Sequence, residues 1–157
     1  MTEEISKLCV TCGMCCDGSL FRHGHLFDQE DIDLAKGLGL EVVENEGFKM
    51  PCKFFDGKCS IWTSEKPKIC EKYFCKPLKR YLNGDIDFDE ASIKVKNLIT
   101  VKEKMLIESR QFEEFNGFTL VQVCDKLDNC NPENLKKYGF LHLIRLDLNT
   151  KLRNFFD

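Results

Sequence analysis

The sequence has no long hydrophobic run. No stretch of its 157 residues approaches the ~18 consecutive apolar residues that a transmembrane helix needs. The opening residues, MTEEISKLC, are acidic and lack the apolar core of a secretory signal. We therefore expect a protein that does not span a membrane and that resides in the cytoplasm, where thiols are kept reduced.

Motifs for phosphate and dinucleotide binding are also missing. The chain has no glycine-rich phosphate loop and no dinucleotide fingerprint, so the nucleotide-binding enzyme classes that use them are excluded. It shows no internal repeat, low-complexity run or linker either. We expect one domain over residues 1–157, with a cysteine cluster region at 8–77 and a mostly helical region at 81–157.

Cysteine, in contrast, is abundant. The chain holds ten cysteines, and four of them fall in the segment CVTCGMCC at residues 9–16. Disulfides are rarely kept in the cytosol, where clustered cysteines more often bind metal. Metal binding is therefore the favoured interpretation, while a disulfide scaffold and a reactive or redox thiol remain open.

The spacing within this segment bears on the choice of metal. Cys9, Cys12 and Cys15 follow each other at intervals of three, so Cys-x2-Cys overlaps itself. Zinc sites usually take two separate Cys-x2-Cys pairs, whereas three close cysteines plus a distant one often hold a [4Fe–4S] cluster. The spacing favours an iron–sulfur cluster, with zinc as the alternative.

Eight cysteines in the first half of the chain could satisfy two four-coordinate centres, or one centre with four thiols left over. Adjacent Cys15 and Cys16 cannot easily point to one side, so they can serve different centres. The predicted metal ligands are Cys9, Cys12, Cys15, Cys16, Cys52, Cys59, Cys70 and Cys75.

Local patterns predict a small α+β fold organised by metal. Residues 18–27 suggest a strand, and residues 28–39 a short helix capped by Asp28, with weak capping-box character from Asp31. Residues 47–62 suggest a hairpin around Asp56-Gly57 that brings Cys52 near Cys59. A helix opened by Pro67 should end before Pro77, because a residue before proline, here Lys76, favours an extended backbone.

The C-terminal half is expected to be helical. Apolar residues recur near helical spacing over 88–115, with Asp89 as the expected N-cap, although this stretch can also be two helices. Residues 118–128 fit a helix better than a strand, and Asn131-Pro132 predicts a further short helix. We expect an apolar tail to dock on the core.

Three segments together resemble the CxxCxxCC family, a zinc- or iron-chelating domain. They are CVTCGMCC, PCKFFDGKCSIW and EKPKICEKYFC, and they place all eight predicted ligands at family positions, together with Ile61 and Pro67. Trp62 stands where the family usually has Tyr, and Lys66 stands where it usually has Arg. The lysine cannot make the bidentate contact that an arginine can make. The resemblance covers roughly residues 8–77. It implies metal chelation without choosing the metal.

Other candidate residues have simpler explanations. His23 and His25 would share one face of a strand and could ligate metal, but such histidines are more often surface residues than ligands. His142 lies in an apolar stretch and fits a packing role. Cys124 and Cys130 lie outside the family pattern and suggest a core and a loop thiol. Residues 49–80 hold nine basic and three acidic residues, which can screen thiolate charge or form a solvated face.

Three functional classes stay open. The protein can be a redox or electron-transfer protein, a zinc-stabilised structural or adaptor module, or a metal-dependent enzyme; a similar cluster occurs in flagellin lysine N-methylases. Whether it is an enzyme is not decided by the sequence. The sequence is also compatible with a protein partner. Nucleic acid is an unfavoured partner, because the chain carries a net charge of −3.

Overall fold

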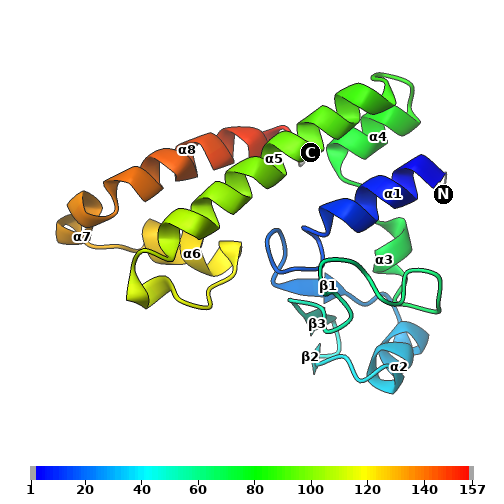
Figure 1. The fold of residues 1–157 in the computed structure, drawn as a ribbon. Helices are drawn as coiled ribbons and strands as arrows, with labels where there is room; N and C mark the ends of the chain where they lie inside the picture. Colours follow the sequence, from blue (N-terminus) through cyan, green and yellow to red (C-terminus); the bar gives the residue numbers. More distant parts are fainter. Residues whose placement is uncertain (1–2, 156–157) are drawn as a thin grey trace. The chain divides into compact units, whose positions relative to one another are not determined.

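Short helices with a small sheet build the first half of the chain, and longer helices build the second. The computed structural model describes residues 3–155 (Figure 1). The chain divides into two compact units, Met1–Phe74 and Cys75–Asp157. The predicted α+β class, with a cysteine-rich N-terminal half and a helical C-terminal half, is confirmed. The single domain over 1–157 stays a prediction.

In its described residues, the first unit contains three short helices and a three-stranded antiparallel sheet, whose strand order is β1-β3-β2. Gly24 pairs with Phe48, and Val42 pairs with Phe48 from the other side. The elements are α1 (Glu3–Cys12), β1 (His23–His25), α2 (Gln29–Gly37), β2 (Val42–Val43), β3 (Gly47–Lys49) and α3 (Ile69–Lys72).

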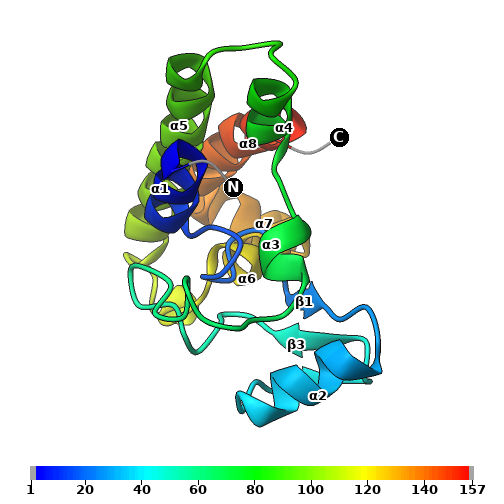
Figure 2. The same ribbon diagram turned by 90° about the vertical axis from the view of Figure 1, so that its right-hand side faces the viewer.

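Helix α2 packs beside this sheet (Figure 2). Its N-cap is Asp28, as predicted, whose side chain accepts the N–H of Asp31. Burial of apolar side chains drives this packing. Cys52 and Cys70 lie partly buried against the same core, so the core and two predicted ligands share one region. The buried core residues are Leu26, Ile32, Ala35, Leu40 and Phe48.

The second unit is built on two helices that lie side by side, α5 (Phe88–Ser109) and α8 (Gly139–Arg153) (Figure 1). Around them lie α4 (Lys76–Leu82), the 3-10 turn η1 (Glu113–Phe115), α6 (Leu120–Asp128) and α7 (Pro132–Lys137). The buried apolar residues of α5 and α8 include Val95, Leu98, Met105, Leu141, Ile144 and Leu148. Among residues 3–155, no helix combines the length and apolarity needed to cross a membrane.

Two helix predictions in this unit are confirmed. The ambiguous segment 118–128 forms α6, because Thr119 and Gln122 make a reciprocal capping box at its start. Asn131 caps α7 through its side chain, and Pro132 occupies the first turn. The long pattern over 88–115 is divided into α5 and η1.

The strand predictions were only partly right. Strand β1 covers three residues of the expected 18–27. The prediction of a hairpin over 47–62 is wrong, because Gly47–Lys49 pairs with β1 and β2 instead. Pro51 also has no N–H with which to continue the hydrogen-bond ladder. Around Asp56-Gly57 a single bridge joins Phe55 to Cys59. The missed hairpin β2–β3 turns through Glu44 and Asn45 at positive φ, which the sequence signals poorly.

Two predictions about helix ends were also wrong. Asp87, not Asp89, caps α5, and its side chain accepts the N–H of Glu90. Lys76 is helical rather than extended, because a new helix, α4, starts there with Pro77 in its first turn, where a proline costs no hydrogen bond. The extended residue is Cys75, the N-cap of α4.

Candidate metal centre

The segment CVTCGMCC folds as a helix end followed by a tight turn. Cys9 and Cys12 lie in α1, and Gly13 follows it in the left-handed region, with φ at +59°. The carbonyl oxygen of Gly13 accepts the N–H of Cys16 at 2.8 Å and that of Asp17 at 3.0 Å. This turn separates Cys15 and Cys16 from the helix that carries the first two cysteines.

The loop that carries Cys52 and Cys59 is bound to this turn. The N–H of Cys52 donates to the carbonyl of Cys16 over 2.7 Å. A Cβ placed on Gly13 would lie 2.0 Å from Cζ of Phe55, so the ring of Phe55 occupies the space that a side chain would take. The bridge between Phe55 and Cys59 then brings the second thiol of the loop back toward the first.

Cys70 reaches the same region from α3. Its N–H donates to the carbonyl of Pro67 at 2.9 Å, and its side chain packs partly buried against the core of the first unit together with Ile69. The sequence predicted that Cys70 and Cys75 would not share a face of an unbroken helix. In the structure α3 ends at Lys72, between the two cysteines.

Four thiols interact electrostatically in this region. Burial raises the pKa of Cys16 from 9.0 to about 12, and Cys70, Cys52 and Cys59 add to the shift by charge repulsion. Burial likewise raises the pKa of Cys70 to about 12, again with contributions from Cys52 and Cys59. Burial raises the pKa of Cys52, against a backbone hydrogen bond from Phe54 that lowers it. Without a cation, Cys16 and Cys70 are therefore held in the protonated form at neutral pH.

The donor chemistry of this thiol group, Cys16, Cys52, Cys59 and Cys70, fits a thiophilic metal. Half-buried sulfurs that repel one another as thiolates are stabilised by a shared cation, and soft thiolates select zinc or iron–sulfur clusters. In the described part of the chain, however, no three His, Cys, Asp or Glu side chains are arranged to hold a metal ion. The ligand set therefore stays a prediction.

Lys66 supplies a positive charge beside the thiol group. Its side chain is only 7% exposed, and its Nζ donates to the carbonyl of Trp62 at 2.6 Å and pairs with Glu71 at 3.1 Å. The Nζ also lies 5.5 Å from the ring centroid of Trp62. Its charge works to lower the pKa of Cys70. A near-buried ammonium here favours a thiolate at that position.

The other four predicted ligands differ in burial. Cys9, Cys12 and Cys15 are half-buried in and after α1, and Cys75 is buried in the second unit at the start of α4. No disulfide joins any of the ten cysteines, all of which fall within residues 3–155. His23 and His25 are both exposed on one face of β1, as expected.

The two cysteines outside the family pattern lie in the second unit. Cys124 is buried in α6, as expected of a core thiol, and burial raises its pKa to about 11. Cys130 is in the loop before α7, with its Sγ 3.4 Å from Nε2 of His142. No sequence pattern singled out the contact between Cys130 and His142.

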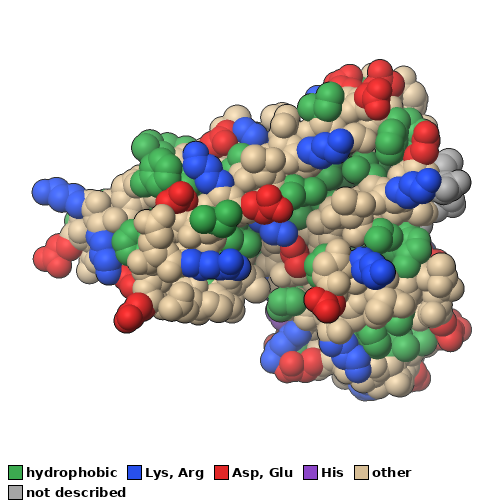
Figure 3. Space-filling view, viewed as in Figure 1, with side chains coloured by type: hydrophobic (Ala, Val, Ile, Leu, Met, Phe, Trp, Pro, Cys, Tyr) green, Lys and Arg blue, Asp and Glu red, His purple; other side chains and the backbone are tan. Residues whose placement is uncertain are grey.

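Three lysines of the basic stretch 49–80 pair with acids: Lys49 with Glu41, Lys66 with Glu71, and Lys68 with Asp28. On the face seen in Figure 3, acidic and basic side chains are interspersed over each unit. Of these three lysines, Lys66 also lies beside the thiol group and lowers the pKa of Cys70.

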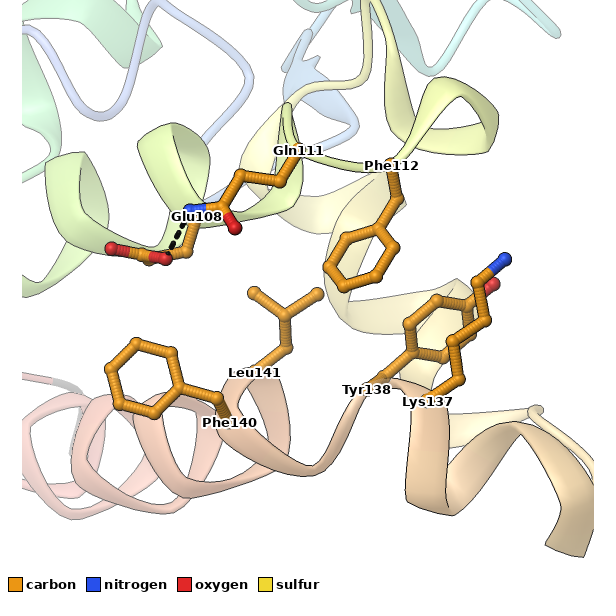
Figure 4. Close-up of a pocket in the computed structure, with 7 residues that line it drawn as sticks. All are labelled: Glu108, Gln111, Phe112, Lys137, Tyr138, Phe140 and Leu141. Carbon is orange, nitrogen blue, oxygen red and sulfur yellow. Dashed lines mark hydrogen bonds between the residues drawn. The ribbon is translucent and has the colours of Figure 1, made fainter.

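A small, open hollow lies in the second unit between the end of α5 and the start of α8 (Figure 4). Phe112 and Tyr138 line it, and the amide of Gln111 donates to Glu108 at 2.6 Å on its rim. Its described lining includes no cysteine or histidine, so it lacks the soft donor groups found in the first unit.

Comparison with protein families gives one match. Residues 8–91 match the model of CxxCxxCC, described as a "putative zinc- or iron-chelating domain". This span is more than half of the 157 residues, so the chain belongs to that family. The curated proteins gave no match, and neither did the solved structures.

Proposed function

We propose, from its membership of the CxxCxxCC family, that this protein binds metal through a four-thiolate centre in its first unit. The ligands of this centre are Cys16, Cys52, Cys59 and Cys70. One observation carries the proposal: Cys52, Cys59 and Cys70, from two other segments, lie close enough to half-buried Cys16 to raise its pKa, and the N–H of Cys52 donates to the carbonyl of Cys16 at 2.7 Å. Such a group is costly to ionise alone, and a divalent cation or cluster removes that cost.

An iron–sulfur cluster is the metal group we favour. The four-thiolate centre does not include Cys9, Cys12 and Cys15, but these three precede Cys16 directly and their overlapping spacing is typical of [4Fe–4S] ligation. Together with Cys75, they remain predicted ligands of the chain. A [4Fe–4S] cluster supplies one-electron transfer, which makes a redox or accessory role the proposed activity. The chain's own contributions are thiolate donors, the amide of Phe54 toward Cys52, and the Lys66 charge.

A zinc-stabilised structural module is the second candidate. It is favoured by the packing of Cys52 and Cys70 against the core of the first unit, because ligands embedded in a small core are suited to cross-linking it. In that case the metal would contribute directly to the folding free energy of the unit.

Anaerobic purification distinguishes these candidates. Iron, sulfide and zinc are measured together with the visible spectrum, on the full chain and on single Cys→Ser variants at positions 16, 52, 59 and 70. We expect bound iron and sulfide in the parent protein and a loss of metal in each variant. The control is Cys124→Ala, a buried cysteine of the second unit that should leave the metal content unchanged.

Three outcomes contradict parts of the proposal. A colourless, zinc-loaded protein after anaerobic handling would overturn the iron–sulfur assignment and leave the structural zinc module. A protein without any metal would overturn metal binding itself. A bound cluster that cannot be reduced reversibly would overturn the redox role.

A further inference from the structure

Asp31 is a buried carboxylate that lies outside the predicted ligand set. It is the third residue of α2 and only 1% exposed. A carboxylate at this depth must have its oxygens satisfied, because burying an unpaired charge is costly. Both oxygens of Asp31 accept backbone N–H groups, from Phe27 at 3.1 Å and from Lys68 at 2.9 Å.

The second of these bonds spans 37 residues of sequence and ends next to a predicted ligand. Lys68 is the N-cap of α3, and it lies two residues before Cys70. The carbonyl of Lys68 accepts the N–H groups of Glu71 and Lys72 in α3, at 3.1 and 3.0 Å, whereas its N–H donates to Asp31. The Asp31 carboxylate therefore holds the segment that delivers Cys70.

The start of α2 holds the same segment in two further ways. The Nζ of Lys68 pairs with Asp28 at 2.7 Å and with Glu30 at 3.3 Å. Ile32, the neighbour of Asp31, belongs to the buried core against which Ile69 and Cys70 pack. The ion pairs are partly exposed and contribute little. The buried bond from the Asp31 carboxylate is the directional contact among them.

We infer that Asp31 is a positioning residue for the metal centre: its carboxylate fixes the Lys68 backbone and thereby places the Cys70 sulfur beside Cys16, Cys52 and Cys59. This inference rests on the proposed function. Partners outside the ligand shell that orient metal ligands typically change metal affinity by about 10–100-fold when they are replaced.

The test is a cobalt titration of the full reduced chain, in which thiolate-to-cobalt absorption reports how many sulfurs bind. Asp31→Asn keeps the size of the side chain and leaves one acceptor oxygen. We expect its cobalt affinity to fall about 10–100-fold, with weaker thiolate absorption per bound ion. Asp33→Asn, an exposed acid on the same helix, and Lys68→Ala, which keeps the backbone N–H, should each stay close to the parent protein.

The cobalt titration of the parent protein separates the proposed metal binding from the positioning role of Asp31. If the parent binds no cobalt, the proposed function fails and the variants are not needed to decide it. If the parent binds cobalt while Asp31→Asn binds it with the same affinity and absorption, the positioning role of Asp31 is wrong. A Lys68→Ala variant as defective as Asp31→Asn would also overturn it, because the ion pairs would then carry the effect.

A measurement on the parent protein alone covers the case in which Asp31→Asn does not fold. Coupling between two sites is reciprocal, so metal binding must strengthen the bond from Lys68 to Asp31. Amide hydrogen exchange at Lys68 should therefore slow when zinc is added, whereas exchange at the Asn149 amide of α8, in the second unit, should not change. Equal exchange at Lys68 with and without zinc would contradict the inference.

Discussion

The ring of Phe55 lies against Gly13, at a distance that leaves no room for any side chain there. A Cβ on Gly13 would come within 2.0 Å of Cζ and 2.3 Å of Cε2 of that ring. Gly13 also has a φ of +59°, which L-residues with side chains rarely adopt. The left-handed φ and the ring of Phe55 therefore each require glycine at position 13 of the CVTCGMCC segment. The Phe55 contact also joins this segment to the loop of Cys52 and Cys59.

Replacement of Gly13 by alanine should therefore destabilise the first unit strongly. The strained φ and the clash with Phe55 together should cost at least about 2 kcal/mol of unfolding free energy. Gly57→Ala is the matched control: it has a similar φ of +68°, but nothing lies within 4 Å of the added Cβ. Urea unfolding followed by the fluorescence of Trp62 measures both. Equal losses for the two variants would show that the Phe55 contact is unimportant.

Metal binding should release protons. Burial and neighbouring thiols raise the pKa of Cys16 and Cys70 to about 12, so both are protonated at neutral pH before a metal binds. Ligation needs thiolates, so the affinity must rise with pH, by up to about tenfold per pH unit for each proton displaced. Zinc titrations against a chelator between pH 6.5 and 8.5 test this. An affinity independent of pH would exclude protonated thiols as the ligands.

Loss of the Lys66 charge should weaken metal binding without removing a ligand. The ammonium lowers the pKa of Cys70, and Lys66→Gln removes this effect. We expect a decrease in zinc affinity of about 3- to 10-fold, the scale of one partly screened charge. Lys66→Arg should keep most of the affinity, and Lys58→Gln, an exposed lysine of the neighbouring loop, should keep all of it. If Lys58→Gln has the same effect as Lys66→Gln, general charge and not the position of Lys66 is responsible.

A buried hydroxyl in α5 offers a test of the second unit. Within residues 3–155, Ser92 is the residue whose buried side-chain oxygen has no hydrogen-bond partner. Ser92→Ala should raise the unfolding free energy by about 1 kcal/mol, because it removes an unsatisfied group and adds a better helix former. Thermal unfolding followed by circular dichroism gives the comparison.

Ser109 is the matched control for this prediction. It lies in the same helix and is 1% exposed, but its hydroxyl donates to the carbonyl of Leu106 at 3.0 Å. Ser109→Ala removes that bond and should not stabilise the protein. A stabilisation of the same size in both variants would mean that helix propensity alone explains the gain.

Local features of the fold could be predicted from the sequence because they depend on neighbouring residues. The cap at Asp28 and the helix start at Asn131-Pro132 were predicted correctly, since the side-chain bonds that Asp28 and Asn131 make there reach only three residues along the chain. The hairpin over 47–62 was not, because the partners of Gly47–Lys49 come from segments on either side, which a local turn signal does not identify. Residues 118–128 were ambiguous until the Thr119 capping box was known.

The sequence by itself determined which residues are candidates: eight cysteines at family spacing, and a helical second half, follow from residue type and periodicity. Only the tertiary structure decided which of these cysteines interact. Cys16 and Cys70 are 54 positions apart, and what brings them together is a backbone bond from Cys52 to Cys16, the Phe55 ring on Gly13 and the Asp31 carboxylate at Lys68. Such contacts depend on three-dimensional packing of distant segments, and no pattern of neighbouring residues encodes them.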